Sequence, residues 1–416
     1  MTWGHSTQAA PDTDSLRSVW VSAYTRAMSA FEDFVLLDPR EVPLGGPRGM
    51  TVHRTLPARR TSLIGAWCFA DHFGPDDLSA GDGMRVARHP HTGLATVSWL
   101  FEGAITHRDS IGHHALVRPG DVDLMVAGSG ITHSEFSTLD TTVLHGVQLW
   151  YALPDRARFR DREFALHTPR PRRTSAAAAR VGLGRFRATD ENGEVLEDAS
   201  PLVTDTALSM VQIDLRAGHR LQVELDPGHE YGVLVDRGTA RLAADGRPAD
   251  GPGASGRQGE APAESADGTQ PGADGPGARS VETDARSRET DVHPRELAVL
   301  PDHVDHLQVQ AAGDEDLRVM LLGGEPLGED ILMWWNFVGR THDEIVQFRA
   351  RYQAEIGVEG TLAEAPIPPK ARTRGGLAAD AEQYGPFAPH TPAALPAPAL
   401  PNGRLRSRGR IGLPKD

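Results

Sequence analysis

Short strand-like segments separated by Gly- and Pro-containing turns dominate the chain from about Asp38 onward, and this pattern restricts the fold most. The segments Leu94–Phe101, Val122–Ala127 and Val143–Tyr151 are rich in Val, Leu, Thr and aromatic residues, with partial period-two alternation. Arg118-Pro119-Gly120-Asp121, between the first two, has turn composition. Many short strands with such turns predict a mostly β fold built from antiparallel barrels or sandwiches.

A second strand-rich region follows residues 156–199, a charged, Arg- and Ala-rich segment that we interpret as a linker. Both strand-rich regions have the same pattern, which indicates two barrels of one kind, at residues 38–155 and 200–360. The strand-like segments of the second region are Ser209–Leu215, Arg220–Glu224, Tyr231–Arg237, Leu297–Leu300 and Leu317–Leu322.

The second region is interrupted by residues 245–291, which contain no aromatic residue, Leu or Ile. Such a segment cannot bury enough apolar surface to offset the entropy of ordering, so we expect a disordered insert at the tip of a hairpin. Aromatic residues make up 6% of the whole chain, a low value that fits a chain with an unfolded part.

The two ends of the chain are predicted to differ from the barrels. Residues 1–37 form an N-terminal extension, in which apolar residues at helical spacing between Ser15 and Phe34 predict an amphipathic helix. A capping box, Thr341-His342-Asp343-Glu344, starts a helix that we expect to close the second barrel with Ile345, Phe348 and Tyr352 on one face. Residues 361–416 are Pro-rich and predict an extended tail along a surface.

Charge and composition exclude several classes of function. The formal net charge of -14 argues against direct binding to nucleic acid, because phosphate contacts need clustered Lys and Arg. Cys68 is the only cysteine, which excludes an internal disulfide and fits a reducing cytoplasm. The chain has no apolar run long enough for a membrane span, so we expect a cytoplasmic protein without membrane contact.

Two short motifs, His89-Pro90-His91 and His133-Ser134-Glu135, have the residue types of one mononuclear metal site. Residues two apart in a strand point to the same face, so each pair can direct both side chains into one barrel. Imidazole nitrogens with one carboxylate oxygen suit a transition ion better than calcium or magnesium. A Pro inside the first pair removes a ladder donor and predicts an edge strand, a bulge or a strand start.

Longer motifs around these pairs resemble the pirin family. They include His89-Pro90-His91-Thr92-Gly93-Leu94, Pro119-Gly120-Asp121, the run from Ala127 to Glu135, His145-Gly146-Val147-Gln148-Leu149-Trp150 and Leu322-Gly323-Gly324-Glu325-Pro326-Leu327. The resemblance implies a bicupin, with two cupin-type antiparallel β-barrels and metal in the N-terminal one. It also implies that His89, His91, His133 and Glu135 are the metal ligands, usually of iron; Ni, Cu, Zn or Mn would also suit them.

The resemblance implies two functions that the residues leave open. The first is a metal-dependent dioxygenase of quercetin 2,3-dioxygenase type, with a flavonol-like aromatic substrate and Glu135 as the catalytic base. The alternative is a non-enzymatic, redox-responsive metal sensor or transcriptional co-regulator that acts through protein partners. A scaffold stabilised by its metal is a third reading. Many pirins have an acidic residue where this chain has Ala95, which bears on substrate handling.

Other residues are assigned in relation to the same metal site. His107, Asp109 and His145 are candidates to line the cavity or support the ligands, because a metal-bound imidazole usually donates its second N–H to a carboxylate or carbonyl. Trp334 and Trp335 fit packing better than ligand contact. The histidines of the second barrel are His219, His229, His303 and His306. They lack two same-face pairs, so we expect no metal in that barrel.

Overall fold

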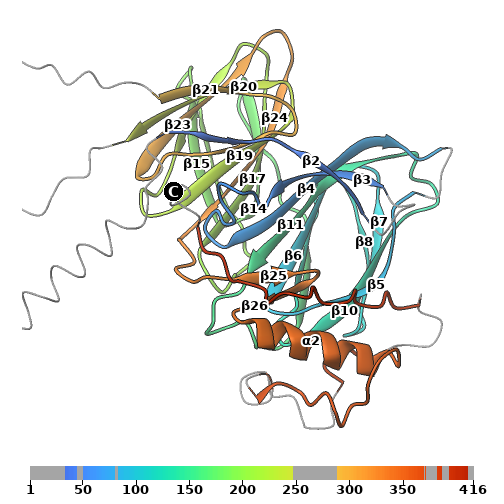
Figure 1. The fold of residues 1–416 in the computed structure, drawn as a ribbon. Helices are drawn as coiled ribbons and strands as arrows, with labels where there is room; N and C mark the ends of the chain where they lie inside the picture. The colour runs from blue at the N-terminus through green and yellow to red at the C-terminus, as the bar shows by residue number, and fades with distance from the viewer. Residues whose placement is uncertain are drawn as a thin grey trace, which may run out of the picture.

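The computed structural model describes residues 33–44, 50–79, 83–246, 288–369, 371, 382–386 and 393–410. The expected N-terminal helix lies outside these residues except at its last positions, and so does most of the insert. Figure 1 shows the described chain as two bodies rich in strands, with the helix α2 (His342–Glu355) below one of them. The prediction of a mostly β chain is therefore confirmed.

The N-terminal domain consists of two antiparallel sheets that share a core. Apolar side chains of both sheets, among them Phe73, Val86, Leu100 and Ile105, pack together between them. The larger sheet has the order β12 (Glu163–His167), β9 (Val122–Val126), β6 (Leu94–Glu102), β11 (Val143–Ala152), β4 (Trp67–Asp77), β3 (Thr51–Leu56) and β2 (Arg40–Pro43). The smaller sheet has the order β5 (Arg85–His91), β10 (Ile131–Ser137), β7 (Ile105–Asp109) and β8 (His114–Val117).

The C-terminal domain repeats this design, with a large cluster of apolar side chains between its sheets. One sheet has the order β1 (Val35–Leu37), β22 (Leu297–Val299), β19 (Glu230–Arg237), β24 (Leu317–Gly324), β17 (Leu208–Leu215), β14 (Ala177–Leu183) and β13 (Arg172–Arg173). The other has the order β16 (Val195–Ala199), β15 (Arg185–Asp190), β18 (Arg220–Glu224), β23 (Val304–Ala312), β20 (Thr239–Gly246) and β21 (Arg288–Val292). A small hairpin, β25 (Leu332–Trp334) and β26 (Phe337–Gly339), follows.

The two domains pack against each other through the outer faces of their seven-stranded sheets. Trp99 and Val147 of the first domain share a buried cluster with Met210, Leu234 and other apolar residues of the second. The indole of Trp99 donates to Gln212 Oε1 at 2.8 Å. Burial of this apolar surface holds the domains together, and the alternate residues of each strand remain free to face the two barrel interiors.

Residues 156–199, predicted as a linker, contain strands. β12 extends the larger N-terminal sheet, and β13 to β16 belong to the C-terminal domain. Ala177, Ala179 and Val181 are buried in the C-terminal core, although Ala adds little to the apolar signal of a sequence. β1 also pairs with the C-terminal β22, so the predicted N-terminal extension contributes a strand to that domain. The linker prediction was wrong because small residues filled the buried positions.

The insert does connect two neighbouring antiparallel strands, as expected for a hairpin. The ladder between β20 and β21 runs from Ala240 opposite Val292 to Ala244 opposite Arg288. Both strands extend into the predicted insert 245–291, so its bounds were drawn a few residues too wide. Residues 247–287 lie outside the described part of the chain.

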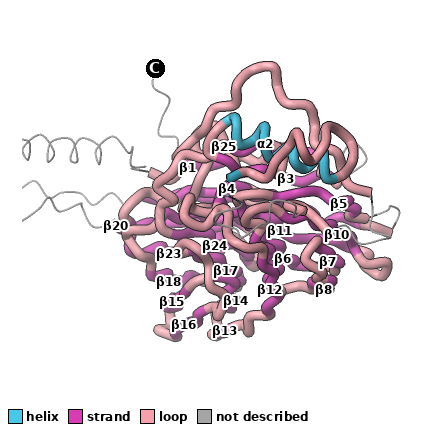
Figure 2. Tube along the Cα trace, turned by 90° about the horizontal axis from the view of Figure 1, so that it is seen from below, coloured by secondary structure: helices cyan, strands magenta, loops and turns pink. Residues whose placement is uncertain are grey.

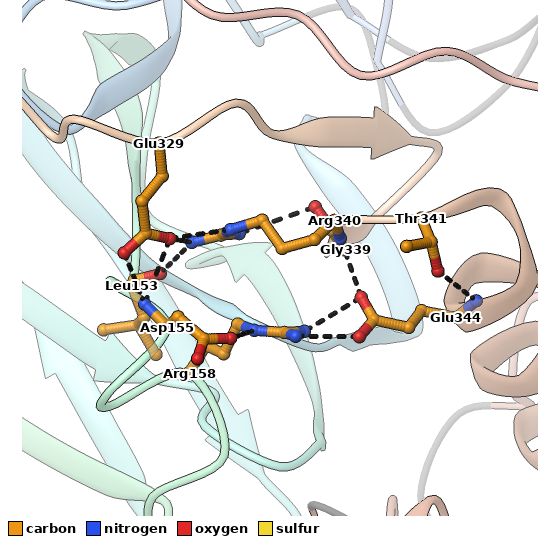
Figure 3. Close-up of polar contacts among 8 residues, drawn as sticks. All are labelled: Leu153, Asp155, Arg158, Glu329, Gly339, Arg340, Thr341 and Glu344. Carbon is orange, nitrogen blue, oxygen red and sulfur yellow. Dashed lines mark hydrogen bonds and ion pairs between the residues drawn. The ribbon is translucent and has the colours of Figure 1, made fainter. Parts of the chain in front are cut away.

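The helix α2 begins where the capping box predicts. Thr341 is its N-cap and accepts the Glu344 N–H at 3.2 Å. The Glu344 carboxylate accepts the Arg340 N–H at 2.7 Å and pairs with Arg158 of the N-terminal domain at 2.7 Å (Figure 3). Asp155 pairs with the same arginine at 2.8 Å. These contacts connect the start of the helix to the N-terminal domain.

We expected this helix to close the second barrel, because it follows that barrel in the sequence. Its contacts show that it does not. Figure 2 shows α2 on the side of the molecule that carries β5 and β10, away from β15 and β16. Its buried face, with Ile345, Phe348 and Tyr352, packs on Phe337 and Tyr384. Among the described residues, no helix is long and apolar enough to cross a membrane.

Candidate metal centre

The two predicted pairs lie opposite each other on neighbouring strands. His89 and His91 end β5, His133 and Glu135 lie in β10, and the register places His133 opposite His89. Pro90 is tolerated because β5 is the edge strand of its sheet, as its missing donor predicted. The ladder between β10 and β5 is irregular between His133 and Glu135.

Three imidazoles converge inside the N-terminal domain. A ligand atom from each of His89, His91 and His133 lies within 4.8 Å of the other two, and all three side chains are buried. The Nε2 atoms of His91 and His133 are 3.1 Å apart. Burial, with neighbouring histidines adding to it, lowers the pKa of His133 and His91 well below the usual value, and lowers that of His89 to about 4. The rings are therefore neutral near pH 7, the form that binds metals.

Glu135 lies beside these rings, offset toward another histidine. Its carboxylate forms a second compact group with His133 and His107, again within 4.8 Å. Ser98 from β6 donates to Glu135 Oε1 at 2.9 Å. Burial, together with the charge of Asp123, raises the pKa of Glu135 to about 7, although His107 and Ser98 oppose the rise. Glu135 can thus change its protonation state near neutral pH.

His107 is a charged neighbour of the site, as its selection from the sequence anticipated. It lies 3.4 Å from Asp109 and 3.4 Å from Asp123. Burial lowers its pKa, but these two carboxylates and Glu135 outweigh burial and raise it to about 10. Asp109 also pairs with the half-exposed His113 at 3.0 Å, so it supports His107 from outside the cavity.

His145 does not belong to this site. It lies at the interface between the domains, 2.6 Å from Asp236 of β19. The sequence analysis named it as a candidate to line the cavity or support the metal ligands, and this prediction was wrong. Its strand β11 faces the other domain at this position, which its sequence motif alone does not reveal.

A cavity of about 610 Å³ opens onto the three histidines and Glu135. Phe69 and Trp150 form a stacked pair in its wall, with ring centroids 4.0 Å apart. The Arg54 guanidinium lies over Phe69 at 4.3 Å and pairs with Asp71 at 2.7 Å. Such a wall offers flat apolar surface and a few polar groups, the composition of a small-molecule site.

Parts of the chain that sequence reasoning assigned to other roles complete this wall. Trp335, with a φ of 50°, lines the cavity together with Met333 and Asn336. From the Pro-rich tail, Leu395 and Pro396 also line it, and the Leu395 N–H donates to the Arg88 carbonyl at 2.7 Å. Trp335 thus lines the cavity as well as packing, and the described part of the tail at Leu395 and Pro396 runs beside this cavity. Two adjacent tryptophans in a sequence do not indicate which of them packs and which lines a cavity.

Ala95 is buried in the apolar cluster between the two domains. Its neighbours on the same face of β6, Val97 and Trp99, belong to that cluster, whereas Ser98 faces Glu135. The absence of an acidic residue at position 95 therefore changes the domain interface of this chain, not the cavity wall.

Each of the four histidines singled out in the C-terminal domain contacts a different residue. His219 pairs with Glu191, His303 lies 3.3 Å from the Pro227 carbonyl, and His306 lies 3.0 Å from Asp305. His229 lies 3.8 Å from Asp226. Within the described part of the chain, none of the four belongs to a group of three convergent ligand residues.

Comparison with known proteins agrees with this architecture. Residues 49–151 match the family model described as Pirin, and residues 277–356 match the Pirin C-terminal cupin domain. A Pseudomonas aeruginosa protein, whose name gives it as a candidate quercetin 2,3-dioxygenase, is 34% identical over 79% of this chain and 89% of its own length. The chain belongs to the pirin family.

Other relatives support the same assignment. A pirin-like protein of Caulobacter vibrioides is 41% identical over 32% of this chain and 47% of its own length. The crystal structure of a quercetin 2,3-dioxygenase from Acinetobacter baumannii is 28% identical, with a TM-score of 0.66 over 90% of this chain and 98% of the other. A second structure from that organism matches the fold, with 21% identity and a TM-score of 0.58 over 80% of this chain and all of the other.

Proposed function

We propose that this pirin-family protein is a metal-dependent dioxygenase of quercetin 2,3-dioxygenase type. His89, His91, His133 and Glu135 would hold one divalent ion, with iron(II) as the first choice, and a flavonol-like molecule would occupy the cavity above them. The names of its relatives in Pseudomonas aeruginosa and Acinetobacter baumannii support the reaction class.

The observation that carries the proposal is the set of neutral imidazoles at the base of an aromatic cavity. The Nε2 atoms of His91 and His133, 3.1 Å apart, can share either the N–H of one neutral imidazole or a cation that replaces it. Burial lowers the pKa of both rings, so neither carries a second proton that would exclude a cation. Three nitrogens and one carboxylate therefore fit a transition ion, and His107 with its two carboxylates orients the far side of the site.

The remaining residues of the cavity have roles that follow from their positions. A bound redox-active ion would supply the positive charge that favours an ionised substrate oxygen, and a path for electrons from the substrate to oxygen. Glu135 would accept the proton of a substrate hydroxyl, and Ser98 would orient its carboxylate through the bond to Oε1. Phe69, Trp150 and Trp335 provide flat surfaces that would hold an aromatic ring system and exclude water.

The test uses the iron-loaded full chain and quercetin. The two are mixed without oxygen, the loss of the flavonol absorption after oxygen exposure is recorded, and the cleavage product is identified. We expect turnover by the wild type, loss of turnover in His133→Ala, and near-normal turnover in Ser134→Ala. Ser134 is the matched control because it lies between two proposed ligands but lines a different cavity.

Metal content separates a failed reaction from a failed site. Elemental analysis of protein purified without added metal gives the resident ion, and the same measurement on His133→Ala shows whether the ligand set holds it. Wild-type protein with a full complement of iron and no ring cleavage above the His133→Ala background would refute the proposed reaction.

A further inference from the structure

A second group of metal-binding side chains lies between the two domains. His72 of β4 and His145 of β11 come from the N-terminal domain, and Asp236 of β19 comes from the C-terminal domain. One ligand atom from each lies within 4.8 Å of the other two, and all three residues are buried.

These three side chains lie at the edge of the domain interface. Ala70, Val147 and Leu234 belong to the apolar cluster between the domains, and each of the three polar residues lies two positions from one of them. Strand alternation accounts for the orientation of His72, because this stretch of β4 pairs regularly with β11. A polar group thus interrupts the edge of an apolar interface, where an unpaired carboxylate would be costly.

Irregular strand pairing sets the orientation of two of the three side chains. Asp236 is an extra residue in β19, because Val235 pairs with Val319 and Arg237 pairs with Arg318 in β24. At His145, the register of β11 also shifts in its ladder with β4 and in its ladder with β6. Bulges of this kind redirect side chains and are concentrated next to functional sites.

The contacts resemble a ligand set more than a pair of ordinary hydrogen bonds. The Nε2 atoms of His72 and His145 lie 2.7 Å and 2.6 Å from the same oxygen, Asp236 Oδ1. The His72 contact has hydrogen-bond geometry, whereas His145 Nε2 lacks that geometry to any described partner. A second nitrogen that approaches the same carboxylate oxygen without a directed N–H leaves three ligand atoms convergent, as they would be around a shared cation.

The surrounding charges leave Asp236 available to such a cation. Arg318 lies 3.4 Å from the other oxygen, Oδ2, and shares its charge with Asp214 at 2.8 Å. It can orient the carboxylate through Oδ2 and leave Oδ1 facing the two histidines, as residues around metal ligands commonly do. Burial lowers the pKa of His72, despite the opposing bond to Asp236, which favours the neutral ligand form.

We propose that His72, His145 and Asp236 form a second cation site, which binds a divalent transition ion such as Zn²⁺ and ties the two domains together. Bonds of about 2.0–2.1 Å in tetrahedral geometry place ligand atoms roughly 3.3 Å apart, so the three side chains must separate by roughly 0.6 Å on binding. This site does not depend on the proposed dioxygenase activity.

The test counts ions in the metal-free full chain as Zn²⁺ is added in competition with a coloured chelator. We expect about two ions per chain for the wild type and about one for Asp236→Asn and for His133→Ala. Glu230→Gln is the matched control: Glu230 is another buried carboxylate of β19 that contacts the other domain, through the Gly65 N–H at 2.7 Å. It should keep both ions.

Thermal unfolding isolates the new site and allows for a variant that folds poorly. Zn²⁺ should raise the melting temperature of His133→Ala, and this gain should disappear when Asp236→Asn or His145→Gln is added. One ion per chain in the wild type and in Asp236→Asn alike would overturn the proposal and leave a hydrogen-bonded cluster. An equal loss of zinc in Glu230→Gln would also overturn it.

Discussion

The interiors of the two domains differ, although both lie between paired antiparallel sheets. The N-terminal interior contains His89, His91, His133 and Glu135 beside a cavity. The C-terminal interior is filled by Val, Leu, Ala and other apolar side chains drawn from both of its sheets. The same architecture can therefore either pack a core or hold an ion, depending on which residues point inward.

This difference indicates that the two domains contribute differently to stability and to the proposed ion site. The C-terminal domain gains its stability from apolar burial, whereas the N-terminal domain accepts buried polar groups that a bound ion would compensate. The C-terminal half still contributes to the site, since Trp335, Asn336 and Pro396 lie in the cavity wall. The predictions below test this difference, from the largest expected effect to the smallest.

Truncation of a core side chain should destabilise the C-terminal domain without affecting metal binding. Leu307 is fully buried in the C-terminal core, so Leu307→Ala should lower the free energy of unfolding by about 2–5 kcal/mol. Denaturant unfolding of metal-free protein measures the loss, and Val195→Ala at an exposed position is the control. A fall in metal affinity of the folded variant would show that the two interiors are not independent.

Metal removal should destabilise the protein through its ligand side chains. At a free metal concentration about 100 times the Kd, binding adds about 2.7 kcal/mol to the free energy of unfolding. We expect one gain of this size for each occupied site, so the gain of the wild type should exceed that of His91→Ala by about 2.7 kcal/mol. Calorimetry with and without Zn²⁺ provides the measurement. An equal gain in both proteins would mean that His91 is not a ligand.

The two adjacent tryptophans should separate substrate binding from stability. Trp335→Ala removes part of the cavity wall and should weaken flavonol binding about tenfold, or about 1.4 kcal/mol, with unchanged iron content. Trp334→Ala is the control, because Trp334 packs beside Phe337 and does not line the cavity. Anaerobic titration with quercetin measures both variants. Equal affinities would exclude Trp335 from the binding surface.

The helix cap provides the smallest effect. Thr341→Ala removes the acceptor for the Glu344 N–H and should cost about 1 kcal/mol of unfolding free energy. Thr341→Ser keeps the hydroxyl and should restore most of the stability. Because the lost bond lies within the first turn of α2, the metal affinity of Thr341→Ala should stay unchanged. A large loss of affinity would show that the helix positions the cavity wall.

Much of the site could be predicted from sequence because it depends on local geometry. Residues two apart in a strand share a face, so the pairs beginning at His89 and His133 needed only neighbouring strands to meet. Trp335 and Leu395 could not be assigned in this way, since they reach the cavity from distant segments. Spacing within a motif contains no information about such contacts.

The errors have physical causes as well. Ala177 and Ala179 are buried in the C-terminal core, but their small side chains made a real strand resemble a linker. His145 was assigned to the wrong cluster, and Asp236 was overlooked. Both lie at irregular positions of their ladders, and a β-bulge leaves no clear mark in a hydrophobic pattern.

The pairing of β20 with β21 has a consequence for engineering. β20 ends at Gly246 and β21 begins at Arg288, which lies opposite Ala244 in the ladder. A connection between neighbouring ladder positions can be shortened to a tight turn or replaced by a reporter domain, because loop closure costs little more as length grows. This junction is therefore a natural attachment point for a sensor of metal loading, and a place where related chains can differ in length at little cost to folding.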